Sequence, residues 1–333
     1  MIDWLKLSAE RQKELLGLAS SRTGLPAYAI EKDWWVTLAL YAVFQTKWAE
    51  HLVFKGGTSL SKSWDLIERF SEDIDLVIDR SVLGFGEDLS KTKVKELRKA
   101  SCAFISGEFR DALEKQLLDL GIPSALFSLK VAPTTESDRD PQVLELYYES
   151  TLEKGNYLKE AVLIEIGARS LREPSEQRPI SSIITQALKN PGITGKAFSV
   201  LTVLPARTFL EKIFLLHEEF SKEPDKIRTE RMSRHLYDLD RIMDTPHGQQ
   251  ALEDQELYHS IVDHRAKFNS IRGISYEKHG PKQINFIPPQ AVIAAWENDY
   301  KAMQESMIYG DSKPFTKLIQ RMVELIERFR KIE

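Results

Sequence analysis

Hydrophobic residues recur at helical spacing close to the start of the chain. Ile30 and Trp34 stand one helical turn apart and predict a helix that begins near residue 27. A charged amphipathic stretch over residues 10–18 predicts a helix before it, and the same spacing predicts helices over residues 58–70 and 91–120. The first third of the chain is therefore expected to be rich in helices.

Short apolar runs bounded by Gly, Pro, Asp or Asn predict strands between these helices and after them. The expected strands cover residues 51–55, 73–78, 125–131, 143–148 and 161–168. After Pro205 the pattern returns to helical spacing, and the expected helices cover residues 206–220, 232–243, 249–268, 289–307 and 316–332. We therefore expect an α+β protein. Residues 1–204 form an α/β domain, a mixed sheet flanked by helices, and residues 205–333 form a helical domain.

The composition is that of a globular protein, with 42% hydrophobic and 29% charged residues among 333. Cys102 is the only cysteine, which excludes an intramolecular disulfide and a cysteine-based zinc site and fits a cytoplasmic protein. No apolar run approaches the roughly 20 residues that span a bilayer, so no membrane is expected as a partner. Residues 1–18 are charged, unlike a signal peptide. The net charge of −4 gives no overall attraction for nucleic acid.

A glycine pair between a predicted strand and a predicted helix is the first candidate for chemistry. Because glycine has no Cβ, Gly56 and Gly57 allow the backbone to approach a phosphate closely. The N–H groups at the start of the following helix can point at the anion, and Thr58 and Ser59 can add hydroxyl donors. Lys62, about one turn later, can place a positive charge on the phosphate. The alternative is an ordinary glycine turn capped by Thr or Ser.

Two acidic residues on the next predicted strand are the second candidate. Asp73 and Asp75 project to the same face of a strand, while Ile74 and Leu76 point to the other face. Carboxylate oxygens are ligands that Mg²⁺ or Mn²⁺ prefers, and such a metal also binds phosphate oxygens. The alternative is an acidic edge strand that faces solvent. The apolar run through residue 78 favours a buried strand, in which unpaired acids would be unfavourable.

Taken together, the two segments resemble the hallmark of the DNA polymerase β type of nucleotidyltransferase. The matching residues are Phe54-Lys55-Gly56-Gly57 and Asp73-Ile74-Asp75-Leu76. The resemblance implies a polymerase-β-like core, with a nucleoside triphosphate as substrate. It also implies a third carboxylate on a neighbouring strand, for which Glu165 is the candidate. Ser71 matches a Ser or Thr of the family that binds phosphate, or it simply starts the strand.

Three further segments are similar to motifs of the AbiEii/AbiGii toxin family of bacterial nucleotidyltransferases. They are residues 31–37 (EKDWWVT), residues 208–212 (TFLEK) and residues 234–238 (RHLYD), and the resemblance covers about residues 25–240. It implies a Mg²⁺-dependent toxin of a toxin–antitoxin or phage-defence system. Its acceptor would be an RNA, with the tRNA 3′ end as the leading candidate, and a cognate antitoxin would be encoded nearby.

The resemblance also assigns roles to two residues of the helical half. Lys212 would balance charge on the triphosphate, and Asp238 would orient Lys212 or the acceptor. Without the resemblance, Lys212 can equally be a surface lysine, and Asp238 can form a surface ion pair with Arg234 one turn away. Lys32 can pair with an acid near the site, but we expect residues 31–35, including both tryptophans, to dock the helix into the core.

Some questions stay open from the sequence. Basic residues over residues 91–99 and at Arg228, Arg231, Arg234 and Arg241 are either solvated helix faces or a track for an RNA backbone. Two other classes of protein compete with the transferase: a non-catalytic module that binds or senses nucleoside triphosphates, and a helical interaction protein. The sequence does not specify the nucleotide, the acceptor, the mode of neutralisation, the oligomeric state or the role of the helices after residue 245.

Overall fold

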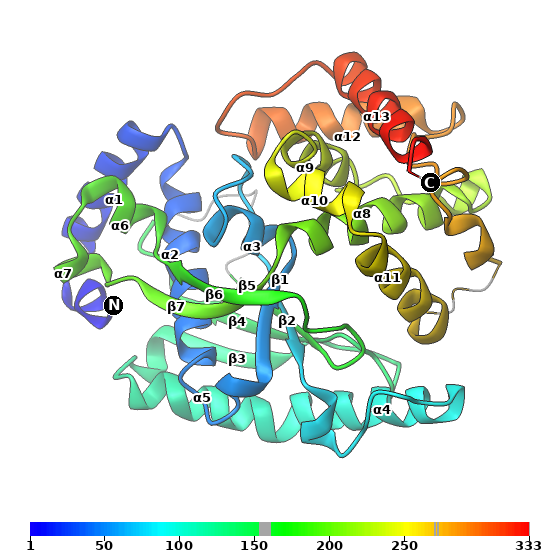
Figure 1. The fold of residues 1–333 in the computed structure, drawn as a ribbon. Helices are drawn as coiled ribbons and strands as arrows, with labels where there is room; N and C mark the ends of the chain where they lie inside the picture. The colour runs from blue at the N-terminus through cyan, green and yellow to red at the C-terminus, as the bar shows by residue number, and fades with distance from the viewer. Residues whose placement is uncertain (153–160, 270, 272, 333) are drawn as a thin grey trace. The chain divides into compact units, whose positions relative to one another are not determined.

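The computed structural model describes residues 1–152, 161–269, 271 and 273–332, and the chain folds into two compact units (Figure 1). The first unit comprises Met1–Trp64 and Ser71–Val203, and the second comprises Asp65–Phe70 and Leu204–Glu333. The short segment Asp65–Phe70, which the sequence prediction places in the first domain, thus belongs to the second unit. This assignment matters because the segment lies between the glycine pair and the two aspartates in the chain.

The first unit is built on a mixed sheet, as expected for an α+β protein. Its strand order is β3-β4-β5-β2-β1-β7-β6. The pairs β2–β5 and β1–β7 are parallel, and the other neighbours are antiparallel. The strands are β1 (Leu52–Lys55), β2 (Ile74–Ile78), β3 (Phe127–Val131), β4 (Gln142–Tyr148), β5 (Ala161–Gly167), β6 (Ser175–Ile180) and β7 (Phe198–Val203).

Two of these strands, β6 and β7, are absent from the sequence prediction. Strand β6 is polar and contains Pro179, which cannot donate to a sheet ladder and is tolerated here because β6 lies at the edge of the sheet. Strand β7 is a short apolar run, and a run of six residues does not distinguish a strand from a buried helix by its periodicity. Its pairing with β1 is a tertiary contact that the local pattern does not contain.

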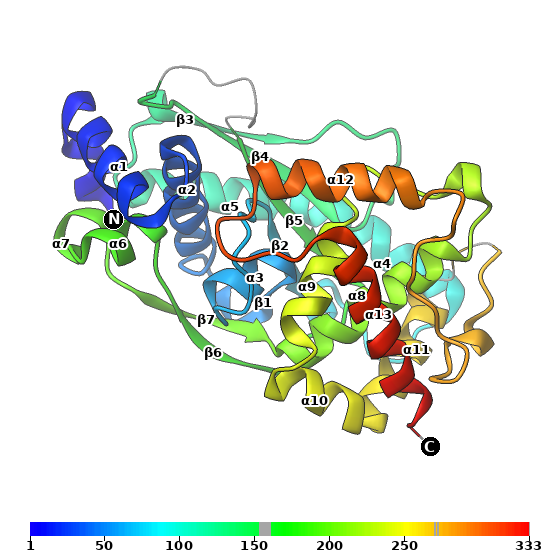
Figure 2. The same cartoon turned by 90° about the horizontal axis from the view of Figure 1, so that it is seen from above.

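Helices cover the sheet of the first unit. They are α1 (Ala9–Thr23), α2 (Ala27–Val43), α3 (Gly56–Lys62), α4 (Lys91–Phe104), α5 (Arg110–Asp119), α6 (Ile183–Leu188) and α7 (Pro191–Thr194). A π-helical turn, Ile105–Phe109, joins α4 to α5, so the predicted helix over residues 91–120 is one continuous helical run. Figure 1 shows α4 and α5 along one face of the sheet, and Figure 2 shows α1 beside α2.

Helix α2 is buried almost all round, which explains its lack of a polar face. Trp34 and Trp35 are 0% and 2% exposed, and the Trp35 ring stacks on Tyr148 with 5.0 Å between centroids. The Trp34 indole N–H donates to the carbonyl of Thr194. Both tryptophans are therefore core residues, as predicted, rather than platforms for a nucleic-acid base.

The predicted helix over residues 58–70 is wrong in its second half. Helix α3 ends at Lys62, and three residues later Asp65 adopts a left-handed backbone conformation with φ 53°. Right-handed helical φ values are negative, so Asp65 cannot continue the helix, although Asp tolerates this region better than most residues. Residues 65–70 are consequently free to take part in the second unit.

The second unit is helical, as expected. Its helices are α8 (Pro205–Phe220), α9 (Arg234–Ile242), α10 (Pro246–Glu253), α11 (Gln255–Phe268), α12 (Ile293–Ser306) and α13 (Phe315–Arg330). The predicted helix over residues 249–268 is divided at Asp254, whose backbone is not helical and whose carboxylate accepts a hydrogen bond from the Leu257 N–H at 2.8 Å. Asp254 is thus the N-cap of α11, a role that favours aspartate.

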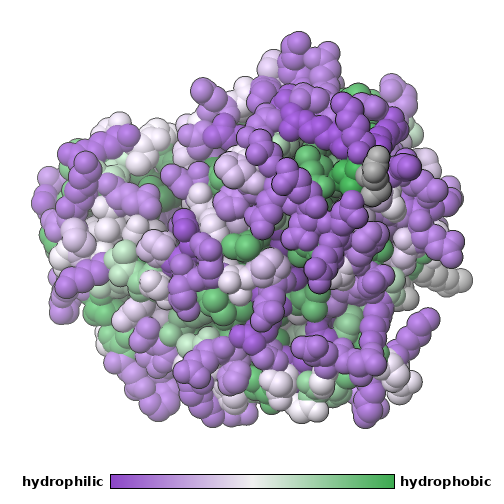
Figure 3. Space-filling model, viewed as in Figure 1, coloured by the Kyte–Doolittle hydropathy of each residue, from purple (hydrophilic) through white to green (hydrophobic). Residues whose placement is uncertain are grey.

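Short helical turns occupy several connections. They are 3₁₀ turns at Ile2–Lys6, Ala49–His51, Arg80–Leu83, Ser124–Leu126, Pro224–Lys226 and Tyr276–His279. Within the part of the chain that the structure describes, no helix combines the length and apolar character needed to cross a membrane. Figure 3 shows mostly hydrophilic residues on the viewed face, with hydrophobic residues in small separate groups.

Candidate functional site

The glycine pair and the two aspartates meet on adjacent strands of the first unit. Strands β1 and β2 are antiparallel, with Lys55 opposite Asp75. Gly56 follows directly and has φ 79°, in the left-handed region that favours glycine. A Cβ atom at Gly56 would collide with the carboxylate of Asp75. Glycine is therefore required at position 56 both for its backbone conformation and for the approach of Asp75.

Asp73 and Asp75 have the alternation that the sequence predicts for a half-buried strand. Both residues are half-buried, whereas Ile74 is fully buried and Leu76 is 2% exposed. Asp73 directly precedes β2, and the alternation of half-buried and buried residues from Asp73 to Leu76 is the one expected when both aspartates share the face away from the two apolar residues. Two carboxylates on one face, beside a backbone without side chains, are the arrangement that the predicted metal and phosphate site requires.

Glu165 lies on the strand next to the two aspartates. In the parallel pair β2–β5 its Cα is the partner of the Asp75 Cα, so both side chains are on the same face of the sheet. Among the described residues, however, no group of three or more His, Cys, Asp or Glu side chains could hold a metal ion. The register brings the two backbones together, but the carboxylates as they lie do not form a three-ligand site. The role of Glu165 as a third ligand stays a prediction.

The hydroxyl groups of the glycine loop are used inside the protein. The Thr58 hydroxyl donates to the backbone carbonyl of Asp73 at 2.5 Å and lies 2.9 Å from the Ser71 hydroxyl. The Ser59 hydroxyl donates to the carbonyl of Gly56 at 2.9 Å. Thr58 and Ser59 are 1% and 0% exposed. The Thr58 contacts fasten α3 to the residues just before β2, and the Ser59 contact lies within α3. A phosphate contact of either hydroxyl, which the sequence predicts, would require these hydrogen bonds to rearrange.

Lys62 is held by an acid rather than pointing freely at the glycines. Its ammonium lies 2.5 Å from the Asp33 carboxylate and donates to the Thr37 hydroxyl at 2.8 Å. Both charged side chains are buried, with 5% and 3% of their surface exposed. A buried carboxylate needs such a counter-charge. Contact between Lys62 and a phosphate, which the sequence predicts, would require this pair to open.

A second buried ion pair joins α2 to the residue before Asp73. The Lys32 ammonium lies 2.6 Å from the Glu72 carboxylate, and their side chains are 3% and 8% exposed. On the same helix, Glu31 accepts hydrogen bonds from Ser150 and Thr151. The charged residues of α2 thus dock this helix, as predicted. The sequence did not identify Glu72 as the partner, because no local spacing relates it to Lys32.

The second unit contains a buried charged cluster between α8 and α9. The Lys212 ammonium lies 2.9 Å from the Asp238 carboxylate. Arg69 binds the same carboxylate through two parallel hydrogen bonds of 2.7 and 2.8 Å. His235 Nδ1 lies 3.4 Å from the Lys212 ammonium. Asp238 is 0% exposed, so the alternative of a surface ion pair is wrong for this residue.

The charges of this cluster shift one another's protonation equilibria. Burial by itself raises the pKa of the Asp238 carboxyl, but the positive charges of Arg69 and Lys212 outweigh burial and hold that pKa well below its usual range. Burial lowers the pKa of the Lys212 ammonium, Arg69 lowers it further, and Asp238 opposes both. Burial, Lys212 and Arg234 together lower the pKa of His235, so its imidazole is neutral at pH 7. The cluster thus presents one carboxylate held by two cations.

Sequence reasoning did not identify Arg69 as part of this cluster. Its side chain is 4% exposed, and its neighbours Ile67 and Phe70 are also buried. An arginine between apolar residues is an unusual pattern, because a buried guanidinium needs a carboxylate partner. This pattern could have indicated that Arg69 is buried and paired with a carboxylate. It could not have identified Asp238 as the partner, because Asp238 is far away in the sequence.

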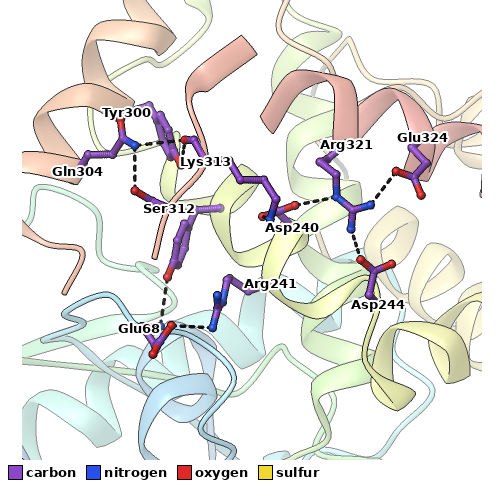
Figure 4. A network of polar contacts seen from close by, with 11 residues as sticks. Glu68, Asp240, Arg241, Asp244, Tyr300, Gln304, Ser312, Lys313, Arg321 and Glu324 are labelled. Carbon is purple, nitrogen blue, oxygen red and sulfur yellow. Dashed lines mark hydrogen bonds and ion pairs between the residues drawn. The ribbon is translucent and has the colours of Figure 1, made fainter. Parts of the chain in front are cut away.

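The helices after residue 245 support the helix that carries Asp238. Asp240 on α9 accepts hydrogen bonds from Lys313 at 2.7 Å and from Arg321 at 3.0 Å (Figure 4). Arg321 also contacts Asp244, at the end of α9. These contacts connect α9 with α13 and with the segment before it. The C-terminal helices therefore have a structural role that the sequence left open.

The basic residues proposed as an RNA track differ in their surroundings. Arg228 pairs with Glu219 at 2.7 Å, and Arg241 pairs with Glu68 at 2.7 Å. On α4, Lys91, Lys95 and Lys99 are exposed. Arg228 and Arg241 therefore serve as ion-pair partners within the second unit, whereas the exposed lysines of α4 are compatible with either interpretation.

Comparison with known protein families identifies one family over most of the chain. A family model described as "Nucleotidyl transferase AbiEii toxin, Type IV TA system" matches residues 38–329. The match extends past residue 240 into the C-terminal helices, and it begins after residues 31–37. No curated protein matches the sequence. A solved structure, the crystal structure of JHP933 from Helicobacter pylori, matches with 13% sequence identity and a TM-score of 0.46, and the match covers 92% of this chain and 94% of that one.

Proposed function

Because the chain belongs to the nucleotidyl transferase AbiEii toxin family of type IV toxin–antitoxin systems, we propose that it transfers a nucleoside monophosphate from a nucleoside triphosphate to an acceptor. The observation that carries the proposal is the approach of Gly56 to Asp75, where a side chain on the glycine would collide with the carboxylate. It supports a polymerase-β-like arrangement, in which the triphosphate lies on the glycine backbone next to the metal carboxylates.

Asp73 and Asp75 would hold the metal in this proposal. Two carboxylates, together with phosphate oxygens and water, form the oxygen ligand set that Mg²⁺ or Mn²⁺ takes in phosphoryl-transfer enzymes, so the residues present fit such an ion. When bound, the metal neutralises charge on the triphosphate and makes the α-phosphorus more reactive. Glu165, whose Cα pairs with that of Asp75 on the neighbouring strand, is the candidate for a further ligand.

The glycine loop would orient the triphosphate for in-line attack. Gly56 and Gly57 are half-exposed, and their backbone can approach phosphate oxygens without a side chain in the way. An acceptor hydroxyl oxygen bonds to the α-phosphorus, the bond from that phosphorus to the bridging oxygen of the β-phosphate breaks, and pyrophosphate leaves. The proton of the hydroxyl passes to solvent.

Lys212 and Asp238 would serve the same reaction. The family resemblance supports this assignment. The 2.9 Å contact between the two side chains supports the role given to Asp238, which is to hold the ammonium in place. We propose that the Lys212 ammonium balances the charge that develops on pyrophosphate and that Asp238 keeps this ammonium in place.

For the acceptor we propose an RNA, and specifically the 3′ end of tRNA, since the family resemblance implies it. The same resemblance supports a cognate antitoxin encoded nearby and a role in phage defence. The exposed lysines of α4 are compatible with an RNA backbone, although their arrangement does not distinguish RNA from solvent.

Transfer of label to RNA tests the proposal directly. Purified full-length protein is incubated with each α-³²P-labelled nucleoside triphosphate, Mg²⁺ and bulk tRNA, with EDTA in a parallel reaction. We expect labelled tRNA that is lost with EDTA and with Asp75→Asn. The matched control is Asp79→Asn, which removes the next acid on the same chain segment, an aspartate paired with Arg172, and should retain transfer. Oxidation of the tRNA 3′ end with periodate should also prevent labelling.

Two results would contradict the proposal. If wild-type protein labels no RNA or protein with any nucleotide, the transferase assignment fails. If it binds a nucleoside triphosphate without turnover, and Asp75→Asn binds equally well, a non-catalytic binding module is the better description. Expression in a bacterial host provides a second test, since growth arrest by the wild type should disappear with Asp73→Ala.

A further inference from the structure

We propose that Arg69 is a positioning residue of the transfer reaction, whose guanidinium fixes the Asp238 carboxylate so that Asp238 holds the Lys212 ammonium in one place. This inference rests on the proposed function. It concerns a residue outside the motifs on which that function was built. Arg69 acts through Asp238 and need not touch a substrate.

The geometry of the Arg69–Asp238 contact is the first argument. Nε donates to Oδ1 at 2.7 Å and Nη2 donates to Oδ2 at 2.8 Å, so both carboxylate oxygens are engaged. A bidentate pair of this kind fixes the plane of the carboxylate as well as its position. The Lys212 ammonium lies 2.9 Å from Oδ2, the oxygen that also accepts from Nη2. A rotation of the carboxylate would therefore change the position of the ammonium.

The backbone of Arg69 is itself held on both sides, which is the second argument. Phe70 N–H donates to the carbonyl of Met307 at 2.7 Å, and Tyr309 N–H donates to the carbonyl of Glu68 at 3.0 Å. Arg69 forms an isolated antiparallel bridge with Ile308 between these two bonds. The guanidinium is thus presented from a fixed backbone rather than from a free loop.

Helix α9 holds the same segment from the other side. The Glu68 N–H donates to the Tyr237 hydroxyl at 3.2 Å, and Arg241 pairs with the Glu68 carboxylate at 2.7 Å (Figure 4). Tyr237 and Arg241 flank Asp238 on α9. Three residues of one helix therefore contact two consecutive residues of the segment, which makes the Arg69–Asp238 pair part of a rigid connection.

The charges around the pair predict what loss of Arg69 would change. Among the described residues, the charged and titratable groups that face Lys212 and Asp238 are Arg69 from the segment, and Arg234, His235 and Tyr237 from α9. The positive charge of Arg69 lowers the pKa of both Lys212 and Asp238. Without it, both groups should titrate at higher pH. A residue with only a packing role would not produce this change.

The experiment compares Arg69→Gln and Arg69→Lys with wild type in the tRNA-labelling assay over a range of pH. For Arg69→Gln we expect a loss of roughly 100-fold in kcat, because small misplacements of catalytic groups have effects of this size. The KM for the nucleotide should change little, and the alkaline limb of the pH profile, which we assign to Lys212, should move to higher pH. Arg69→Lys keeps the charge but loses the fork geometry. It should leave the alkaline limb in place while kcat falls.

The matched control is Arg265→Gln in the same unit. Arg265 also makes a bidentate contact with a buried carboxylate, that of Glu218, and this pair is separate from the Lys212–Asp238 cluster. Its loss should lower thermal stability without moving the pH profile. If Arg69→Gln behaves like Arg265→Gln, with lower stability and an unchanged profile and kcat, the inference is overturned. If Arg69→Gln does not fold, a wild-type kcat in Arg69→Lys overturns it.

A second readout does not depend on activity. In protein labelled with ¹³C-lysine, the Lys212 Cε signal, assigned by its absence in Lys212→Met, reports the protonation of this ammonium. We expect it to titrate at higher pH in Arg69→Gln than in wild type. An unchanged titration would count against Arg69. If wild-type protein labels no acceptor, the proposed function fails, while this titration still decides whether Arg69 controls Lys212.

Discussion

The ammonium of Lys32 lies 2.6 Å from the carboxylate of Glu72, and both side chains are almost completely buried. Glu72 directly precedes Asp73, so this pair connects the central helix α2 with the strand that carries the candidate metal ligands. Because the pair is buried, neither charge is solvated by water, and each is stabilised mainly by the other.

The Lys32–Glu72 pair should show the asymmetry of buried ion pairs. Removal of one partner leaves an uncompensated buried charge, so Lys32→Met or Glu72→Gln alone should lower the free energy of unfolding by about 3–5 kcal/mol. The double variant should lose less than the sum of the single losses. Urea denaturation measures these values. The surface pair Lys47–Glu108, with side chains 64% and 55% exposed, provides the comparison, and Lys47→Met should cost no more than about 1 kcal/mol.

A side chain at position 56 should abolish transfer because it displaces Asp75, in addition to straining the backbone. Gly56 and Gly84 have the same φ of 79°, but a Cβ at Gly84 would have no heavy atom within 4 Å. Both Gly→Ala variants incur left-handed strain of roughly 1–2 kcal/mol, while only Gly56→Ala displaces the Asp75 carboxylate. We expect Gly84→Ala to retain transfer and Gly56→Ala to lose it. Equal activity in the two variants would argue against a functional approach of Gly56 to Asp75.

His235 should make stability depend on pH near neutrality. Its pKa in the folded state lies well below the ordinary value of 6.5. As pH falls below 6.5, the imidazole in the unfolded chain gains a proton that the folded state resists, so the free energy of unfolding decreases. Denaturation between pH 7.5 and 5.5 should therefore show a smaller slope in His235→Gln than in wild type. His259→Gln, at an exposed position, should leave the slope unchanged.

The contacts of Asp240 with the C-terminal segment should contribute to the stability of the fold. It accepts from Lys313 and Arg321 and is 7% exposed, so Asp240→Asn leaves two cations without their shared partner. We expect a loss of about 1–3 kcal/mol in unfolding free energy. Glu327→Gln, which breaks an exposed pair within α13, should change stability by less than about 0.5 kcal/mol. Equal effects in the two variants would mean that the Asp240 contacts do not stabilise α9.

Local features of the site were readable in the sequence because they depend on neighbours in the chain. The alternation around Asp73 and Asp75 follows from the two-residue period of a strand, and the position of Gly56 follows from a turn that only glycine adopts without strain. Helix α2 was also predicted, since its apolar spacing is long and regular. The resemblance to the toxin family rested on these same short motifs and on Lys212 and Asp238.

Partners that lie far apart in the sequence were decided by the tertiary structure. The sequence alone placed Lys62 near a phosphate, whereas the fold pairs it with Asp33. It left Asp238 either orienting Lys212 or paired with Arg234 at the surface, whereas the fold buries this residue between Arg69 and Lys212. The pattern along the chain determined which local conformations formed and which faces were apolar. The pairing of the buried charges was decided only by the tertiary structure. A buried charge needs a partner of opposite sign because it has lost its contact with water, and that partner can come from any part of the chain that the fold brings near it.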